Sequence, residues 1–205
     1  MRDSEPTHAD KDEPERLLER YLAGDMTAFE ILVELYQDRL YWFIERLTGD
    51  PHLAEDVFQS VFLKVANKAG DFDRRASFST WLFRIARNCA IDEMRKQRRH
   101  LQFVDPGLEE WLGRRKIDAQ PTPLERTEGG ELQCLVRALL ADIPAVQREA
   151  FLLKEEADLG FREIANVLGC GKETAKSRFR LAVEKLREGL TRMGWNPAGK
   201  RGGDA

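Results

Sequence analysis

Hydrophobic residues recur along most of this chain at intervals of three and four, the spacing that places side chains on one face of an α-helix. No stretch shows the strict alternation of apolar and polar residues that indicates a β-strand. Glycine and proline mark the ends of several periodic segments, for example at Gly49 and Pro51. The predicted helices span residues 14–23, 27–47, 53–68, 79–99, 132–141, 144–156, 161–168 and a last one that begins at residue 172.

One segment, residues 101–131, lacks this periodicity and separates two groups of predicted helices. It contains three prolines and a glycine pair, together with seven acidic residues against four basic ones. This composition favours a linker. The sequence therefore predicts an all-α fold in which two small helical domains, residues 14–100 and 132–192, are joined by an acidic linker. Residues 1–13, which are acidic, and residues 193–205 are expected to be disordered tails.

The last two predicted helices are separated only by the turn Gly169-Cys170-Gly171. Two helices joined by a tight, glycine-containing turn are the plan of a helix-turn-helix, whose second helix enters the DNA major groove. The apolar face of that second helix is formed by Ala175, Phe179, Ala182, Val183 and Leu186. Its other faces carry the cationic and hydroxyl side chains that contact phosphates and base edges, namely Lys172, Thr174, Lys176, Ser177, Arg178, Arg180 and Arg187. The alternative is an ordinary amphipathic helix with a solvated charged face, but the turn, the preceding short helix and the excess of cations together favour DNA binding.

The net charge of −3 is distributed unevenly along the chain. Residues 84–100 hold six basic and two acidic side chains, and residues 172–188 hold six basic and three acidic ones. Residues 1–15, in contrast, hold six acids against two bases. Because local patches set the attraction to phosphates, a slightly acidic total charge is compatible with nucleic-acid binding.

The first basic segment belongs to the predicted helix of residues 79–99, which has one packed face and one polar face. The packed face contains Leu82, Ile85, Ala86, Cys89 and Ala90. The polar face carries an arginine stripe, which we define as Arg84, Arg87, Arg95 and Arg98 with Asn88, and no acidic residue along that face is expected to pair with it. The neighbouring aromatic residues Phe72, Phe78, Trp81 and Phe83 are of the kind that stacks on unpaired bases. The alternative is that they belong to the core, which we favour for at least two of Phe78, Trp81 and Phe83. Two basic helices on two domains imply two DNA contacts, whereas a repressor needs only one.

Few other kinds of chemistry are indicated. The three cysteines and three histidines are scattered without a C-x-x-C pair, so no zinc site is predicted. No P-loop, ordered carboxylate cluster or His/Cys arrangement is present, so we predict no catalytic residue, metal or cofactor. Cys170 is expected to be a reduced thiol, and a redox-sensitive exposed thiol is the alternative. The absence of a long apolar run and of a signal peptide predicts a cytoplasmic protein without membrane insertion.

Three segments, in this order along the chain, resemble a known family. They are AEDVFQSVFLKV (Ala54–Val65), FDRRASFSTWLFRIARNCAIDEMRKQRR (Phe72–Arg99) and TAKSRFR within the helix-turn-helix (Thr174–Arg180). Together they resemble the extracytoplasmic-function sigma factors, the small two-domain subunits that give bacterial RNA polymerase its promoter specificity. The likeness covers residues 14–100 and 132–190. The combination of motifs is specific, whereas the helix-turn-helix alone would be a weak signal.

The resemblance implies a sigma factor, which is not an enzyme: a protein that binds core polymerase, reads the minus-35 promoter element as duplex, and melts and captures the minus-10 element. The residues implied in binding the polymerase clamp are Asp56, Gln59, Phe62 and Leu63. Those implied in minus-10 binding are Phe72, Asp73, Ser77, Trp81, Arg84, Asn88, Arg95 and Arg98. Those implied in minus-35 binding are Lys172, Glu173, Thr174, Lys176, Ser177, Arg178 and Arg180. The resemblance also implies an anti-sigma factor as a partner, and a linker that runs through the polymerase toward the template strand.

The chain departs from the family pattern at several positions. Ser60 replaces an acid that often follows the glutamine of the clamp segment, and Gly171 stands where a capping Ser or Thr is common. Leu181 and Val183 occupy positions where the family often has further arginines, which reduces the expected phosphate contacts. Glu173 either accepts a hydrogen bond from a cytosine amino group or favours the helix dipole.

Two other classes of function are disfavoured by the sequence. A transcriptional regulator would bind a palindromic site as a symmetric dimer; the arginine stripe and the long acidic linker disfavour it. A nuclease would use Asp56 or the carboxylates of Asp92 and Glu93, but these acids form no ordered catalytic cluster.

Overall fold

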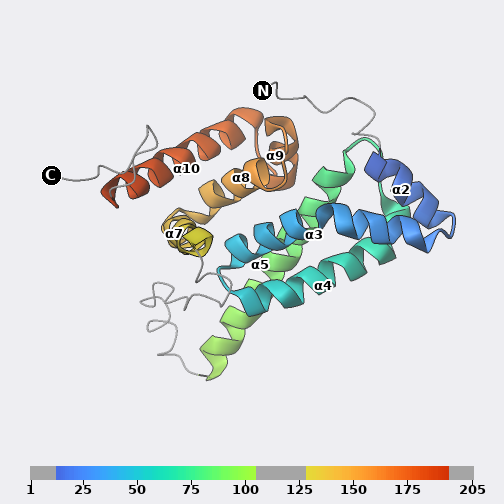
Figure 1. Ribbon diagram of the computed structural model, residues 1–205, viewed down its shortest axis with the longest axis horizontal. Coiled ribbons are helices and arrows are strands. Elements are labelled where there is room, and N and C mark those ends of the chain that lie inside the picture. Colours follow the sequence, from blue (N-terminus) through green and yellow to red (C-terminus); the bar gives the residue numbers. More distant parts are fainter. Residues whose placement is uncertain (1–12, 105–127, 194–205) are drawn as a thin grey trace.

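The computed structural model describes residues 13–104 and 128–193, which form helices joined by short turns (Figure 1). The N-terminal group contains α2 (Glu13–Leu22), α3 (Met26–Thr48), α4 (Pro51–Lys68), the short 3-10 helix η1 (Ala69–Asp71) and α5 (Phe78–Val104). The C-terminal group contains α7 (Glu128–Ala141), α8 (Ala145–Glu155), α9 (Phe161–Leu168) and α10 (Lys172–Arg192). No strand occurs within the described residues, and the all-α prediction is confirmed. The predicted tails and the middle of the predicted linker lie outside these ranges.

The N-terminal domain is built around α3, which contacts α2, α4 and α5. The rings of Phe43 and Phe83 meet edge to face at the centre of its core, with centroids 5.2 Å apart, and both side chains are fully buried. The start of α4 is fixed by its cap, because the Asp50 carboxylate accepts hydrogen bonds from the backbone N–H groups of His52 and Leu53. Pro51 occupies the first turn, where its missing N–H removes no helical hydrogen bond.

In the C-terminal domain, α10 packs against α8 and α9. The turn between α9 and α10 depends on Gly169, which has a φ of 63° in the left-handed region that side chains disfavour. Gly189 of α10 lies directly against Leu139 of α7, and both residues are buried, so the lack of a side chain at Gly189 allows close approach of the two helices.

Helix boundaries agree with the sequence prediction except beside the linker. Helix α5 continues through residues 101–104, and α7 begins at Glu128 although the prediction placed its start at residue 132. The first helix-breaking residue after α5 is Pro106, so the charged composition of the segment does not itself end the helix. The pair Gly129-Gly130 lies in the first turn of α7, where backbone N–H groups have no partner within the helix in any case.

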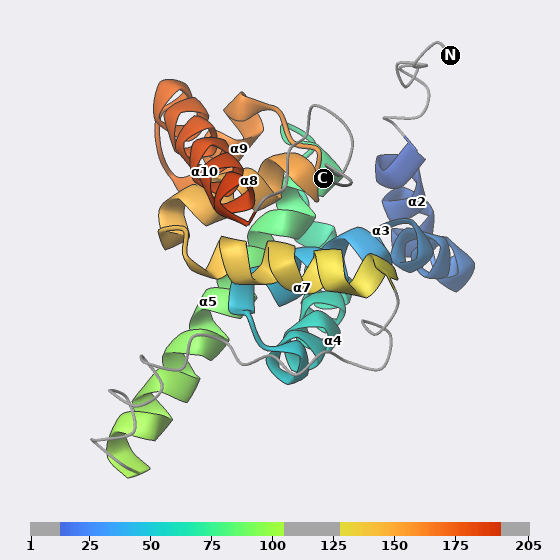
Figure 2. The ribbon, with the colours of Figure 1, turned by 60° about the vertical axis from the view of Figure 1, so that its left-hand side comes forward.

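The two domains contact one another directly. Helix α8 packs on α3 and helix α9 packs on α5, and the first turn of α9 lies beside the start of α5. Figure 2 shows the C-terminal half of α5 extending beyond the rest of the molecule. Within the parts of the chain described above, no helix is long and apolar enough to cross a membrane.

Candidate nucleic-acid interface

Helix α10 presents a basic face because its apolar face is held against the rest of the C-terminal domain. Ala175 and Ala182 are completely buried, as the helical periodicity predicted. The ring of Phe179 stacks on Phe151, with centroids 6.1 Å apart, and meets Phe161 edge-on at 5.6 Å. These contacts fix the rotation of α10 about its own axis. The predicted minus-35 residues are therefore exposed, except Arg178, which is half-buried; the exposed ones are Lys172, Glu173, Thr174, Lys176, Ser177 and Arg180.

The turn before α10 agrees with the weak cap expected from the sequence. Gly171 adopts an extended conformation with φ −73° and ψ 153°, and no side chain accepts a hydrogen bond at this position. Cys170 is a half-buried free thiol packed against the core.

The arginine stripe lies along α5, as predicted, but its members differ in their surroundings. Arg84, Asn88, Arg95 and Arg98 are exposed. Arg87 is half-buried, and its Nε donates to Glu149 Oε2 of α8 across 2.7 Å. The Arg95 guanidinium lies 4.0 Å from the carboxylate of Asp92, one turn earlier. The expectation that no acid pairs with this stripe was therefore wrong, because Asp92 flanks the stripe and Glu149 comes from the other domain.

The aromatic residues near the stripe form a connected group. The ring of Phe72 lies 6.2 Å from Phe78 and 5.4 Å from Trp81. Phe78 and Phe83 are fully buried, which confirms that at least two of Phe78, Trp81 and Phe83 belong to the core, whereas Trp81 and Phe72 are half-buried. The group anchors the loop between η1 and α5, the predicted site of minus-10 base capture.

A cavity of about 360 Å³ opens beside this loop and is lined by Asp71, Asp73, Arg75, Ala76, Thr80, Trp81, Arg84 and Asn166. Asn166 comes from α9, and the other residues come from η1, the loop and α5. The carboxylate of Asp73 accepts hydrogen bonds from the Arg75 backbone N–H at 3.0 Å and from Arg75 Nε at 2.7 Å. The backbone N–H first, and then the guanidinium, lower the pKa of Asp73. The cavity lining therefore combines the carboxylates of Asp71 and Asp73 with the guanidinium groups of Arg75 and Arg84.

Ser77, predicted to bind DNA, caps α5 in this structure. Its Oγ accepts from the Thr80 backbone N–H at 3.3 Å, and Phe78 N–H donates to Glu15 of α2 at 2.6 Å. The Ser77 hydroxyl donates to Glu163 Oε1 of α9 at 2.6 Å, and the Thr80 hydroxyl donates to the same oxygen at 2.8 Å.

Sequence analysis did not identify Glu163 as part of the site. Its other carboxylate oxygen, Oε2, accepts from the Gly160 backbone N–H at 2.8 Å, so the same side chain closes the first turn of α9. A signal was present, because an acid three residues after the N-cap, here Gly160, is one half of the capping-box pattern. That pattern predicts the cap alone; the partners Ser77 and Thr80 lie more than eighty residues earlier in the chain.

The predicted polymerase-binding residues lie on α4. Asp56, Gln59 and Leu63 are exposed, whereas Phe62 is half-buried, with its ring against Phe58 and Phe29. Leu63 has two thirds of its surface exposed, which is unusual for a large apolar side chain in a domain with a well-formed core.

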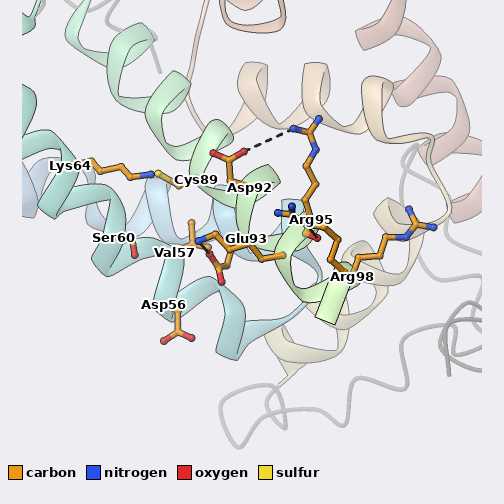
Figure 3. Close-up of a pocket in the computed structure, with 11 residues that line it drawn as sticks. Asp56, Val57, Ser60, Lys64, Cys89, Asp92, Glu93, Arg95 and Arg98 are labelled. Atoms are coloured by element: carbon orange, nitrogen blue, oxygen red, sulfur yellow. Dashed lines mark hydrogen bonds and ion pairs between the residues drawn. The ribbon is translucent and has the colours of Figure 1, made fainter. Parts of the chain in front are cut away.

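A second cavity, of about 770 Å³, lies between α4 and the outer half of α5 (Figure 3). Asp56, Ser60 and Lys64 line it from α4, and Arg95 and Arg98 are among its lining residues on α5. The structure thus brings one predicted polymerase-binding residue and two predicted minus-10 residues to the same cavity. No group of three or more metal-ligating side chains gathers here or elsewhere in residues 13–104 and 128–193.

Comparison with known proteins gives a consistent result for both domains. Residues 32–100 match the family described as Sigma-70 region 2, and residues 135–186 match the one described as Sigma-70, region 4. The ECF RNA polymerase sigma factor SigW of Bacillus subtilis is 32% identical over 170 residues, which cover 82% of this chain and 91% of the relative. The RNA polymerase sigma-H factor of Pseudomonas aeruginosa is 30% identical over 188 residues, which cover 89% and 97%.

Two solved structures are similar to the whole described fold. The sigma factor RpoE in complex with the anti-sigma factor NepR, from Bartonella quintana, has 28% identity and a TM-score of 0.65, covering 80% of this chain and 96% of that one. CnrH in complex with the cytosolic domain of CnrY has the same TM-score at 22% identity, covering 88% and 99%, and supports the fold alone.

Proposed function

The chain belongs to the extracytoplasmic-function sigma factors, within the sigma-70 family of bacterial RNA polymerase subunits, and on this premise we propose that it directs promoter-specific initiation in the cytoplasm through two separate DNA contacts. In this proposal α10 reads the minus-35 element as duplex. The arginine stripe and the loop before α5 melt and hold the minus-10 element. The exposed face of α4 around Asp56 and Leu63 binds core polymerase.

The observation that carries the proposal is the presence of two exposed basic helices on two domains. Long cations attract phosphates, and neighbouring hydroxyl and amide groups contact base edges. On α10, the packing of Phe179 against Phe151 and Phe161 holds these cationic and hydroxyl side chains on the exposed face of the helix. On α5 it lies beside a cavity lined by Trp81 and Arg84, a ring and a guanidinium suited to an unpaired base.

An anti-sigma factor completes the proposed set of partners. The similar structure from Bartonella quintana is a complex of a sigma factor with an anti-sigma factor, which supports a partner of this class for the present chain.

Reconstituted transcription tests the proposal. Purified core polymerase with the full chain should yield transcripts that start at defined promoters in a pool of genomic fragments, and core polymerase alone should not. A chain that binds duplex DNA tightly as a free symmetric dimer and fails to stimulate polymerase would instead be a transcriptional regulator, and the proposal would be wrong.

A further inference from the structure

Helix α2 packs on α3 and on η1, next to the loop of residues 72–77 that leads into α5 (Figure 1). Two glutamates of α2 contact this loop or its end. Glu15 Oε1 accepts a hydrogen bond from the backbone N–H of Phe78, the first residue of α5, at 2.6 Å. The Glu19 carboxylate forms an ion pair with Arg74 in the middle of the loop. Residues four apart share a helix face, so one face of α2 is directed at the proposed minus-10 loop.

The first turn of α5 is capped from two places. Ser77 Oγ accepts from the Thr80 backbone N–H at 3.3 Å, and this cap uses residues of the same turn. The Phe78 N–H, in contrast, is paired with Glu15, which lies 63 residues earlier in the chain. A carboxylate is favoured at this point because the first turn of a helix carries a partial positive charge. A hydrogen bond to a charged acceptor is also about twice as strong as one between neutral groups.

The two contacts made by α2 differ in strength. The side chains of Glu19 and Arg74 are 52% and 64% exposed, and an ion pair in contact with water contributes little. Glu15 is half-buried, and its second oxygen, Oε2, is buried without a hydrogen-bond partner among the described residues. Loss of the Glu15 carboxylate would leave the Phe78 N–H unpaired in a part-buried position, which is unfavourable. Glu15 is therefore the residue of this face that fixes the start of α5.

Phe78 connects this backbone contact to both ends of the loop. Its ring meets Tyr36 of α3 edge to face, with centroids 5.2 Å apart, and the Tyr36 hydroxyl is hydrogen-bonded to Ser79 at 2.9 Å. The same Phe78 ring lies 6.2 Å from Phe72, at the other end of the loop. The position of Phe78 thus sets the position of the loop, and Glu15 holds the backbone of Phe78.

We propose that α2 is a brace for the minus-10 loop, with Glu15 as a positioning residue. By binding the Phe78 N–H, Glu15 keeps residues 72–77 in the conformation that captures an unpaired base. This inference rests on the proposed function of the loop and adds to it a residue from another helix. A loop that is already ordered loses less conformational entropy when a base binds. Strand melting should therefore depend on Glu15, whereas duplex binding by α10 and polymerase binding by α4 should not.

The test uses full-length proteins and two kinds of measurement. Hydrogen exchange followed residue by residue by NMR reports how often the Phe78 amide opens in the free chain. In holoenzyme on a promoter fragment found in the transcription assay, permanganate footprinting reports unpaired thymines, and a mobility shift at low temperature reports duplex binding. Glu15→Ala removes the acceptor, and Glu15→Gln keeps a neutral acceptor of nearly the same size. The control Glu30→Ala removes an acid from an exposed position of α3.

We expect Glu15→Ala to speed exchange of the Phe78 amide about tenfold, because a hydrogen bond to a charged group contributes at least that factor. The melted fraction should fall by up to about tenfold as the population of correctly positioned loops falls. Glu15→Gln should restore most of both losses, and Glu30→Ala should match the wild type. Polymerase affinity, duplex binding and exchange in the core of α3 should be unchanged in every variant, which distinguishes lost positioning from lost folding.

Three outcomes would count against the inference or its premise. Unchanged exchange at Phe78 in Glu15→Ala would overturn the brace, and so would faster exchange spread equally over α3 and α4, which indicates general destabilisation. Faster exchange at Phe78 with normal melting would overturn the positioning role. If the wild type itself neither melts promoters nor supports initiation, the proposed function fails, while the exchange measurement still decides whether α2 braces the loop.

Discussion

Arg137 of α7 and Glu45 of α3 form an ion pair between the two domains, with Arg137 Nε and Glu45 Oε1 2.5 Å apart. The two side chains are only 7% and 2% exposed, so both charges have lost nearly all contact with bulk water. Here the N-terminal domain supplies the acid, whereas in the pairs Arg46–Glu156 and Arg87–Glu149 it supplies the base. Removal of one partner leaves the other charge buried without its counterion, which is far less favourable than replacing both.

The pair can be tested by replacing its members singly and together. We expect Arg137→Met to lower the free energy of unfolding by up to about 3–5 kcal/mol, less if the domains open to hydrate Glu45. The double variant Glu45→Leu/Arg137→Met should recover most of that loss, since two apolar side chains then face one another. Urea denaturation followed by circular dichroism gives both values, and a double variant as unstable as the single one would show that desolvated charge is not the cause.

A second prediction concerns the exposed cations of α10. Replacing Arg180 with Ala should reduce by about one the slope of log affinity against log salt for holoenzyme on a promoter fragment found in the transcription assay, because one phosphate contact is lost. Arg192→Ala removes the same charge from the far end of the helix, where it should leave the slope unchanged. Equal slopes for the Arg180 variant and the wild type would remove Arg180 from the DNA contact.

The α4 surface offers a matched pair of acids for testing polymerase binding. Asp56 and Glu55 are adjacent and both exposed, and only Asp56 is assigned to the clamp contact. Asp56→Ala should weaken binding to core polymerase about tenfold, the size expected for a significant interface residue. Glu55→Ala should have little effect. Biolayer interferometry with immobilised core polymerase measures both, and equal losses would indicate a general charge effect rather than a specific contact.

Two glycines in the turn of the helix-turn-helix give two predictions, one of lower and one of higher stability. Gly169→Ala should destabilise the chain by about 1–2 kcal/mol, because an alanine at a φ of 63° is strained although no neighbouring atom lies within 4 Å of the added Cβ. Gly171→Ser should stabilise it by a few tenths of a kcal/mol, since serine is a somewhat better helix cap than glycine. Thermal unfolding compares the two with the wild type, and similar shifts of one sign would contradict the assigned backbone roles.

The local part of the fold could be predicted from the sequence. Gly160 and Gly171 each come directly before a segment whose apolar residues recur at helical spacing. The structure begins α9 and α10 at the residues predicted from this pattern, Phe161 and Lys172. The same helical spacing predicted that Ala175 and Ala182 would be buried, as they are. Such features depend on neighbours within a few residues, which a single sequence displays directly. The functional roles of the exposed side chains on α10 stay predictions.

The contacts between domains could not be predicted in this way. Arg87 lies on the polar face of its helix, and its partner Glu149 is 62 residues away on a helix whose position depends on the packing of α8 against α3. Glu163 carries a local capping signal, but nothing in the sequence indicates that its second oxygen accepts from Ser77. Which side chains pair across such a separation in sequence depends on how the helices pack in three dimensions.

The length of α5 has a consequence for the order of events when the protein meets DNA. Its 27 residues span about 40 Å at a rise of about 1.5 Å per residue, and the contacts that Thr80 and Arg87 make with the C-terminal domain lie in its first half. The outer half, with Arg95 and Arg98 exposed, projects beyond the other helices (Figure 2). Long-range attraction to phosphates therefore acts first on this projecting arm, so we expect the rate of encounter with DNA to fall as the salt concentration rises.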